Sequence, residues 1–289
     1  MAGDALFKSV VLLLNGNGPN GSTDIVDASP SAHAVGLFGA VQISTAQAMF
    51  GGSSLLFGGG DRVQIPDSAD WDFGTGDFSI EIALRFSAIY DTTTLLGNYP
   101  GWVVQYRPDS GGFVFGVNND KLKIAPFSPV LNTWYRLGIR RVSGAMSIFV
   151  DEAPIGSPSA VSTDISGSVA PLLIGELYAG GYIQQFHGHM AHIRITREAR
   201  DLDSQPTAPW PDYATQFQGV VRDSADLPCS RRVRAYRRDT GVLVGSAVSD
   251  AESGIYTLNS THVGAHTLNF LPNDGEALNA LVLDNVYGV

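Results

Sequence analysis

The sequence predicts an all-β protein, and three observations carry that prediction. Only 16% of the residues are charged, and Gly supplies 33 of the 289 residues. That composition is typical of many short strands joined by turns. Helical spacing of apolar residues is nearly absent. In Phe78–Phe86 (FSIEIALRF) every second residue is apolar, which is the pattern of a strand with one face in a two-sheet sandwich.

Ten strands are expected before residue 200, because short apolar runs end there at Gly, Asn, Asp or Pro. They are Ser9–Leu14, Ser54–Phe57, Arg62–Ile65, Phe78–Phe86, Gly101–Tyr106, Gly112–Val117, Tyr135–Val142, Ala145–Val150, Ala170–Ile174 and Gly188–Ile195. Residues 201–218 hold Pro206, Pro209 and Pro211. Dense prolines do not fit a sheet ladder, so we expect a stiff extended linker there.

A second β domain is expected over residues 219–289. DTG at 239–241 and SG at 253–254 supply its turns. Its expected strands are Gln218–Arg222, Arg231–Arg237, Val242–Ser249, Gly254–Leu258, Ala265–Leu271 and Ala277–Asn285. The predicted organisation is therefore a domain at 1–200, a linker at 201–218 and a small domain at 219–289.

The net charge of −10 and the sequence pI near 4.9 disfavour binding to nucleic acid or to an anionic membrane. A neutral glycan or a protein partner remains compatible with this charge. Cys229 is the only cysteine, so no intramolecular disulfide forms. The apolar run after Lys8 is about five residues long, too short for a signal peptide or a membrane helix. We expect synthesis in the cytoplasm without membrane insertion.

The first domain resembles the laminin-G type of the concanavalin A-like jelly roll. The resemblance rests on an ordered set of segments that covers about residues 8–200. They are SSLLFGGGDRVQIPDSADWDFGTGDFSIEIALRF (53–86), LNTWYRLGIRR (131–141), SIFVDEAPIG (147–156), PLLIGE (171–176) and FHGHMAHIRITREAR (186–200). The resemblance implies a jelly-roll sandwich.

The second domain resembles small carboxypeptidase regulatory-like sandwiches, on GVVRDSADLPCSRRVRAYRRDTGVLVGSAVSDAESGIYTL (219–258). EALNALVLDNVYGV (276–289) is similar to the last strand of such modules in tailed-phage virion proteins, and RITREAR (194–200) to the closing strand of phage laminin-G-like domains. These resemblances imply a virion protein of the tail, neck or capsid surface, assembled in the host cytoplasm and released by lysis. Its expected partners are other virion proteins and further copies of itself.

Calcium is the candidate cofactor, because jelly rolls of the resembled class often hold one at a rim. Such an ion needs six to eight oxygen ligands. The candidate ligands are Asp27, Asp61 and Asp151, with Asp24 in a similar turn. The alternative is that these Asp residues only stabilise their own turns.

Three histidines, His187, His189 and His192, lie within six residues. On a regular strand, His187 and His189 share one face and His192 points to the other. They do not converge on one ion unless a bulge intervenes, and zinc needs three or four ligands. We therefore expect these histidines to be polar residues of an edge strand.

Catalysis is not expected. Glycosidases built on this jelly roll place two carboxylates on one strand, whereas Glu81 stands alone in SIEIAL. Tyr99 and Trp102, in NYPGWVVQY (98–106), are candidates to stack on a sugar, as is Trp210 in the linker. They are equally compatible with burial in the core.

RRVRAYRRDTG (231–241) places five arginines within eight residues. Arg232, Arg234 and, across Tyr236, Arg238 are expected on one face of a strand, as a solvated face or an interface to an acidic partner. Residues 219–289 hold six Arg and no Lys against eight Asp and Glu, which disfavours nucleic acid. The sequence therefore predicts a non-enzymatic virion structural protein, with a carbohydrate-binding receptor adhesin as the alternative.

Overall fold

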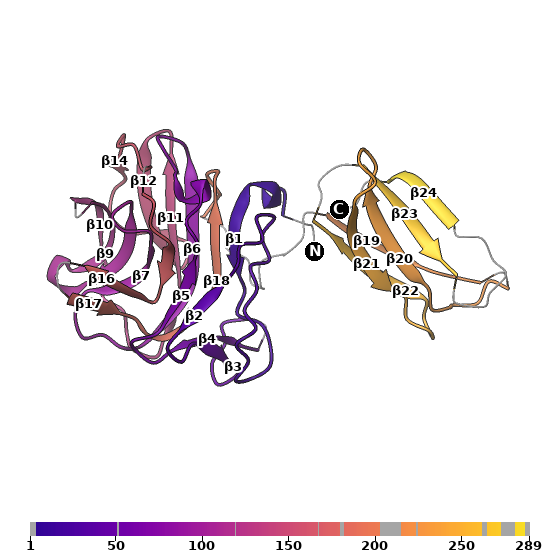
Figure 1. Cartoon of the computed structure of the whole chain (residues 1–289), viewed down its shortest axis with the longest axis horizontal. Coiled ribbons are helices and arrows are strands. Elements are labelled where there is room, and N and C mark those ends of the chain that lie inside the picture. Colours follow the sequence, from indigo (N-terminus) through magenta and orange to yellow (C-terminus); the bar gives the residue numbers. More distant parts are fainter. Residues whose placement is uncertain are drawn as a thin grey trace. The chain divides into compact units, whose positions relative to one another are not determined.

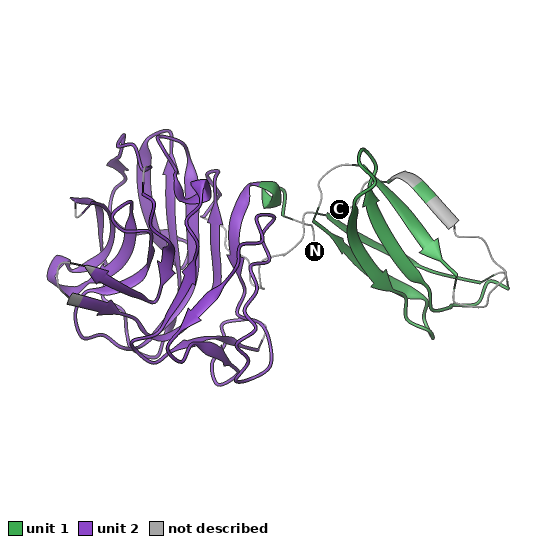
Figure 2. Ribbon diagram, in the orientation of Figure 1, with its two compact units in different colours: residues 1–8, 211–289 green, residues 9–210 purple. Residues whose placement is uncertain are grey.

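The computed structural model describes residues 4–50, 52–118, 120–166, 168–179, 182–202, 215–223, 225–261, 265–272 and 281–286. The chain divides into two compact units, one at Ser9–Trp210 and one that joins Met1–Lys8 to Pro211–Val289 (Figure 2). Both consist of strands (Figure 1), so the predicted all-β class is confirmed. None of the described helices has the length and apolarity needed to span a membrane.

The larger unit, hereafter the jelly roll, is a sandwich of two antiparallel sheets. In the described residues the larger sheet has nine strands. They are β1 (Val10–Leu14), β3 (Gln42–Ser44), β4 (Ser54–Phe57), β6 (Phe78–Ala88), β11 (Trp134–Val142), β12 (Ala145–Val150), β13 (Ala153–Pro154), β14 (Ser159–Ala160) and β18 (His187–Thr196). Its main path runs β13-β12-β11-β6-β18-β4-β3.

The smaller sheet has seven strands in the same ranges, in the order β10-β9-β8-β7-β15-β5-β2. They are β2 (Gly36–Phe38), β5 (Arg62–Ile65), β7 (Thr93–Gly97), β8 (Val103–Arg107), β9 (Gly112–Val117), β10 (Asp120–Pro126) and β15 (Leu172–Ile174). A separate hairpin, β16 (Glu176–Ala179) and β17 (Tyr182–Gln185), lies against β7. Two short 3₁₀ turns complete the unit, η2 (Ala69–Trp71) and η3 (Pro108–Ser110). A third, η1 (Phe7–Ser9), crosses the division between the two units in the sequence.

The core fills the space between the two sheets. The apolar face predicted for β6 is fully buried there, since Phe78, Ile80, Ile82, Leu84 and Phe86 are all 0% exposed. Aromatic side chains from several strands pack on one another, and the Phe73 and Phe78 rings stack at 4.1 Å. Buried aromatic area on this scale supplies most of the driving force for folding.

The opposite face of β6 is buried as well. Glu81 is 2% exposed and accepts two hydrogen bonds from Arg194, at 2.6 and 2.7 Å. Leu202, which is 0% exposed, lies against Gly138 of β11. The chain that follows β18 therefore covers this face of the sheet.

β18 is an inner strand of the larger sheet, so the expectation of an edge strand for its histidines is wrong. It pairs with β6 along one side, and along the other with β4 at Gly188–Met190 and with β1 at Ile193–Thr196. A register shift between Ala191 and Arg194, with His192 at a φ of +50°, marks a bulge. The bulge lies where one pairing partner gives way to the next.

The smaller unit, hereafter the C-terminal module, packs a two-stranded sheet and a four-stranded sheet around its own core. The strands are β19 (Thr215–Val220), β20 (Arg232–Arg237), β21 (Leu243–Val248), β22 (Ile255–Ser260), β23 (His266–Leu271) and β24 (Leu281–Val286), in the orders β19-β22 and β21-β20-β23-β24. Phe217, Val233, Tyr256, Leu258 and Leu268 form the centre of that core. β19 begins at Thr215, inside the range expected for the linker; residues 203–214 lie outside the described part.

Candidate functional site

The candidate site is a hollow of about 270 Å³ on the outer face of the seven-stranded sheet. Alternation along β8 builds its floor. Val104 and Tyr106 point into the core, while Val103, Gln105 and Arg107 line the hollow. On the next strand, Val114 and Gly116 line it too, so together with Val103 they make part of the floor apolar beside Gln105.

The β16–β17 hairpin forms a wall of the hollow. Leu177 and Gln184 are directly opposite each other in the hairpin ladder, and both line the hollow. Leu177 packs with Val103 of the floor and with Tyr99. The hairpin is thus held against the sheet by apolar contact, which leaves polar groups beside it to face the space.

A buried amide network lies where the floor meets the wall. Nε2 of Gln105 donates to Oγ1 of Thr94 at 3.2 Å and to Oε1 of Gln184. Oγ1 of Thr94 donates to the same Gln184 oxygen at 3.0 Å. Among the described residues, Oε1 of Gln105 and Nε2 of Gln184 have no hydrogen-bond partner. One acceptor and one donor remain for a ligand.

Charged residues surround the opening. Asp91, Asp120, Arg107 and Lys121 line it. Asp109 lies behind Arg107 and Lys121, at 3.4 and 3.6 Å. Burial acts to raise the pKa of Asp109, but a Ser110 hydrogen bond and the two cations together hold that pKa below its ordinary value. Both signs of charge are present, which suits a ligand rich in hydroxyl groups more than a single ion.

Tyr99 and Trp102, the two aromatic residues predicted to bind a sugar, separate in the structure. Tyr99 lines the hollow and is half-buried. Trp102 is 1% exposed, its Nε1 donates to the Trp71 carbonyl at 2.9 Å, and its ring packs on Phe73 and Phe115. The interpretation of Trp102 as a sugar-stacking residue is wrong, because the ring faces the core. Trp210 lies outside the described residues.

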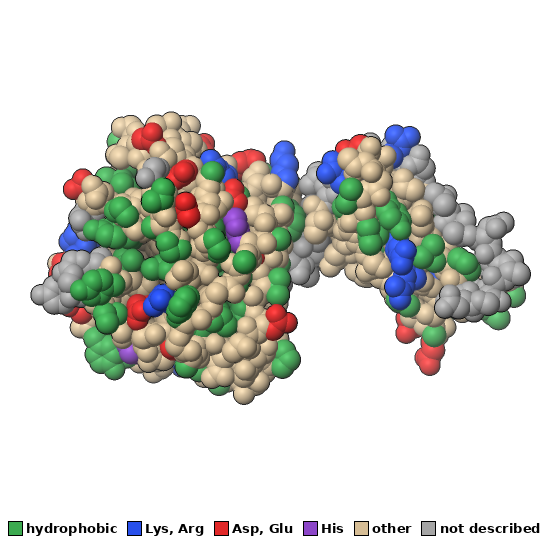
Figure 3. Space-filling view, in the orientation of Figure 1, with side chains coloured by type: hydrophobic (Ala, Val, Ile, Leu, Met, Phe, Trp, Pro, Cys, Tyr) green, Lys and Arg blue, Asp and Glu red, His purple; other side chains and the backbone are tan. Residues whose placement is uncertain are grey.

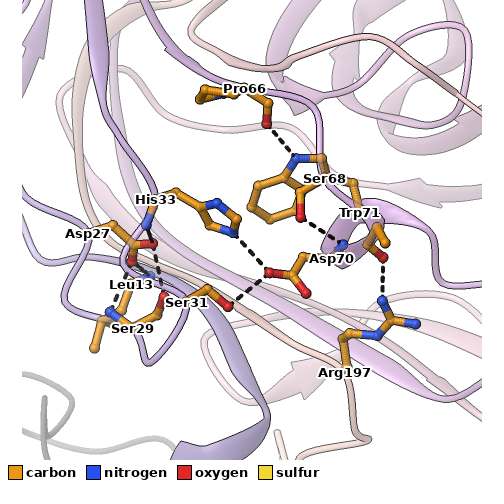
Figure 4. A network of polar contacts seen from close by, with 11 residues as sticks. Leu13, Asp27, Ser29, Ser31, His33, Pro66, Ser68, Asp70, Trp71 and Arg197 are labelled. Carbon is orange, nitrogen blue, oxygen red and sulfur yellow. Dashed lines mark hydrogen bonds and ion pairs between the residues drawn. The ribbon is translucent and has the colours of Figure 1, made fainter.

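Asp27 holds a loop together (Figure 4). Its Oδ1 accepts from the backbone N–H groups of Leu13 and Ser29, and its Oδ2 from the N–H of His33 and the hydroxyl of Ser29, all at 2.9–3.0 Å. The carboxylate is 4% exposed. Both oxygens are thus engaged by donors of the chain itself, as in an Asp-stabilised turn.

Ser31 and His33 of the same loop form a group with Asp70 of η2 that the sequence did not indicate. Nε2 of His33 and Oγ of Ser31 both bond Oδ2 of Asp70, at 2.9 and 2.8 Å (Figure 4). A nucleophilic relay needs the histidine between the hydroxyl and the carboxylate. Here Asp70 stands between the other two, so the group joins the loop to η2.

Two other calcium candidates, Asp61 and Asp151, also accept hydrogen bonds from backbone N–H groups of the chain. Asp61 accepts from the N–H groups of Ala40 and Gly58, at 2.7 and 2.6 Å, and Asp151 from the N–H of Arg136 at 2.9 Å. Asp24 is exposed. No group of three or more His, Cys, Asp or Glu residues close enough to hold a metal occurs in the described ranges. The predicted calcium ligands therefore do not converge.

Backbone carbonyls do converge on the side chain of Arg141. This guanidinium is 0% exposed and donates to the carbonyl oxygens of Phe73, Gly74, Gly76 and Thr163. Burial lowers the pKa of Arg141, and the charges of Asp77 and Asp164 oppose that shift. A permanent cation of the chain thus satisfies these backbone carbonyls.

The bulge in β18 changes the positions expected for the histidines without bringing them together. His189 is buried and its Nδ1 bonds the hydroxyl of Ser54 at 3.0 Å. His192 packs on Phe50 with ring centroids 5.7 Å apart, and burial lowers its pKa to about 4. His187 packs edge-on against Tyr90. The three imidazoles therefore contact different residues, and each of them packs within the domain.

The arginines predicted at an interface lie on and beyond β20. Arg232 and Arg234 share the outer face of that strand. Arg238 follows the end of the strand, where its N–H donates to the Ala265 carbonyl. The expectation that Arg238 continues the row is wrong, because the strand ends at Arg237 and a turn begins.

Sequence reasoning missed most of the hollow. Thr94 and Gln105 lie on consecutive strands, but Gln184 comes from a hairpin about 80 residues further along the chain, and that hairpin at 176–185 gave no strand signal. The one usable signal was polar residues at alternate positions in WVVQYR (102–107). That alternation marks a sheet face with a polar side, but it does not show what covers the face.

Comparisons with known proteins agree with this architecture. The chain is similar to domain 4 of AbnA, a GH43 extracellular arabinanase from Geobacillus stearothermophilus, solved in complex with arabinotriose (13% identity, TM-score 0.52, 68% of this chain and 97% of that one). It is also similar to the binding domain of Paraclostridial Mosquitocidal Protein 1 (13% identity, TM-score 0.55, 98% and 74%). A third similar structure is the receptor binding domain of botulinum neurotoxin C/D mosaic serotype (12% identity, TM-score 0.53, 92% and 72%).

At these identities the likeness concerns the fold. No curated protein sequence matches the chain. The model of one protein family, described as the concanavalin A-like lectin/glucanases superfamily, matches residues 57–204, just over half of the chain. That range includes both sheets' central strands and the hollow. The chain therefore belongs to the concanavalin A-like lectin/glucanases superfamily.

Proposed function

We propose that the jelly roll is a non-enzymatic binding module that takes a carbohydrate in the hollow beneath the β16–β17 hairpin. The observation that carries the proposal is the pairing of an apolar floor with the open amide groups of Gln105 and Gln184. Sugars present C–H faces and hydroxyl edges together, and such a surface matches both. Asp91 and Asp120 at the opening add acceptors for further hydroxyl groups.

Proteins of similar structure support the same class of ligand. The arabinanase domain was solved with arabinotriose. Another similar structure, at TM-score 0.51 and 16% identity, comes from botulinum neurotoxin type C, whose cell entry depends on interaction with two ganglioside molecules. Both of these ligands contain sugar, which favours a carbohydrate as the ligand of the hollow.

The absence of enzymatic activity is part of the proposal. The lone carboxylate on β6, Glu81, is buried and held by Arg194. A glycosidase of this type needs two carboxylates that flank the scissile bond. Glu81 has no access to a glycosidic bond, so the residues of β6 favour binding without hydrolysis.

A glycan array with the full chain tests the proposal. Tyr99→Ala and Gln184→Leu are expected to abolish the binding of any glycan that the wild-type chain retains. The matched control is Tyr178→Ala, since Tyr178 is 68% exposed and does not line the hollow. Binding that survives the first two substitutions, or a wild-type chain that binds no glycan, would refute a sugar site here. Trp102 is unsuitable for this test, because its replacement damages the core.

The setting that we propose is a phage virion, with the chain on the tail, neck or capsid surface beside other virion proteins and copies of itself. The support is the similarity of residues 276–289 and 194–200 to phage segments. Mass spectrometry of purified particles tests this setting, with the chain expected at a fixed stoichiometry. Light scattering of the purified chain tests for an oligomer. Absence from intact particles would refute the virion assignment and leave the glycan proposal standing.

A further inference from the structure

The outer face of β20 in the C-terminal module carries a short row of basic and aromatic side chains, which we name the arginine face. Val233 and Ala235 of β20 are 0% exposed and point into the core of the module. Arg232, Arg234 and Tyr236 therefore point away from it. In Figure 3, basic side chains lie on the body and at the upper end of this unit, and acidic side chains are visible at its upper and lower ends.

The ladder register fixes the neighbours of each side chain in this row. On this face, each residue of β20 has one partner on β21 and one on β23, which gives three rows of three residues across the sheet. Arg232 lies between Val248 and Leu271, Arg234 between Ser246 and Asn269, and Tyr236 between Leu243 and Thr267. Val248 is 58% exposed and Leu243 is 49% exposed. Apolar groups thus flank the arginines on the same face, and no carboxylate stands among these nine residues.

The side chains of Arg232 and Arg234 make no hydrogen bond and no ion pair within the described part of the chain. Carboxylates are not scarce in the module. Arg222 pairs with Asp226 at 3.8 Å, and Arg237 with Asp239 at 2.7 Å, both in turns. Directly beside Arg234, Oδ1 of Asn269 is buried without a hydrogen-bond partner. The face thus offers donors that no described residue uses.

The spacing of these groups matches an extended polypeptide. Side chains at alternate positions of a strand are about 7 Å apart, and an extended ligand strand repeats its own side chains at the same distance. A guanidinium binds a carboxylate through two parallel hydrogen bonds. Two arginines on one strand face therefore fit two carboxylates that are separated by one residue.

We propose that the arginine face binds an extended acidic segment of a partner protein, with Asp or Glu at alternate positions. Charge complementarity supports a polypeptide over a nucleic acid. The chain as a whole carries a net charge of −10, which repels a long polyanion at a distance but leaves a short segment free to dock on a local basic face. This inference is independent of the carbohydrate proposal, because it concerns the other unit.

Fluorescence anisotropy with the full-length chain tests the inference. One labelled peptide alternates Glu with Ser, and its isomer has the same composition with all Glu residues adjacent. The alternating peptide is expected to bind at least ten times more tightly than its isomer. Arg232→Gln with Arg234→Gln is expected to weaken binding at least tenfold. The control Arg222→Gln removes one charge from a turn and is expected to change affinity less than twofold.

Four results would overturn the inference. The first is equal affinity for the two peptides, and the second is unchanged affinity after Arg232→Gln with Arg234→Gln. The third is tighter, equally substitution-sensitive binding of heparin or of a single-stranded oligonucleotide, which would assign the face to a polyanion. Self-association that both substitutions abolish, without peptide binding, would also overturn it and assign the face to a second copy. Thermal unfolding of each variant confirms that the exposed substitutions leave the fold intact.

Discussion

Two arginines of the jelly roll and two of the C-terminal module differ in burial and in what their side chains contact. In the jelly roll, Arg141 and Arg194 are buried and donate to carbonyl or carboxylate oxygens of the chain. In the C-terminal module, Arg232 and Arg234 lie on a sheet face with no described side-chain partner. A buried guanidinium with satisfied donors holds structure, whereas an exposed one with free donors is available to another molecule. The same residue type therefore satisfies internal oxygens in the jelly roll, and in the C-terminal module it presents donors that no described residue uses.

Arg141→Met is the substitution expected to weaken the protein most. It leaves the carbonyls of Phe73, Gly74 and Gly76 without their donor and the nearby Asp77 and Asp164 without their cation. The expected loss in free energy of unfolding is about 5 kcal/mol, measured by urea denaturation. Added calcium that restored stability to this variant alone would show that the position accepts a metal ion. A loss below about 1 kcal/mol would contradict the structural role.

Arg194→Met is expected to cost about 3 to 4 kcal/mol, since it removes both hydrogen bonds of Arg194 to the buried Glu81 and leaves Arg200, at 3.8 Å, as the remaining described cation beside that carboxylate. Adding Glu81→Met is expected to recover a large part of that loss, because an apolar pair needs no charge compensation. A double-mutant cycle in denaturant gives the coupling energy. Additive losses would mean that the two residues do not act as a pair.

The stability of the jelly roll is expected to fall on acidification because of His192. Burial holds its pKa at about 4, below the ordinary 6.5, so the unfolded chain binds more protons than the folded chain between these values. The stabilisation is complete above about pH 6.5 and is lost as the pH falls towards 4, by roughly 3 kcal/mol.

His192→Asn is the matched variant for this acid effect, because Asn tolerates the left-handed φ of +50° at this position. The variant is expected to lose less stability between pH 7 and pH 4.5 than the wild type. The acid loss that remains includes His189, whose pKa is lowered by burial and by the charge of Arg85. An unchanged pH profile would exclude His192 as the source.

Arg232→Met with Arg234→Met is expected to have the smallest effect on folding. Neither side chain bonds a described residue, so the free energy of unfolding is expected to change by less than about 0.5 kcal/mol. The same urea series used for Arg141→Met supplies the measurement. A large loss here would remove the contrast between the two units.

The fold was predictable from sequence wherever one face of a strand is apolar. Phe78–Phe86 alternates strictly and is found as β6. No strand was predicted at β10, because its sequence, DKLKIAP, contains lysines and a proline and because it lies at the edge of its sheet. Edge strands need only one partner and one buried face, so their apolar signal is weak.

The site was less predictable than the fold. Alternation fixes which residues share a face, but not which of the two faces is covered. Trp102 begins the stretch that leads into β8 and was therefore as compatible with a sugar as with the core. Asp27 and Asp61 occur in turns whether they bind an ion or a backbone N–H, and only their three-dimensional contacts distinguish the two.

The way the chain leaves the jelly roll has a mechanical consequence. It departs from β18, which is paired on both sides, and its next residues are held by the Arg200 side chain on Thr196 and by Leu202 against Gly138. A pulling force on the following segment must first extract Leu202 and then load an inner strand lengthwise. Ladder bonds on two flanks share such a load, whereas an edge strand would peel away one bond at a time. A force applied to the chain after Leu202 would therefore be resisted by ladder bonds on both sides of β18.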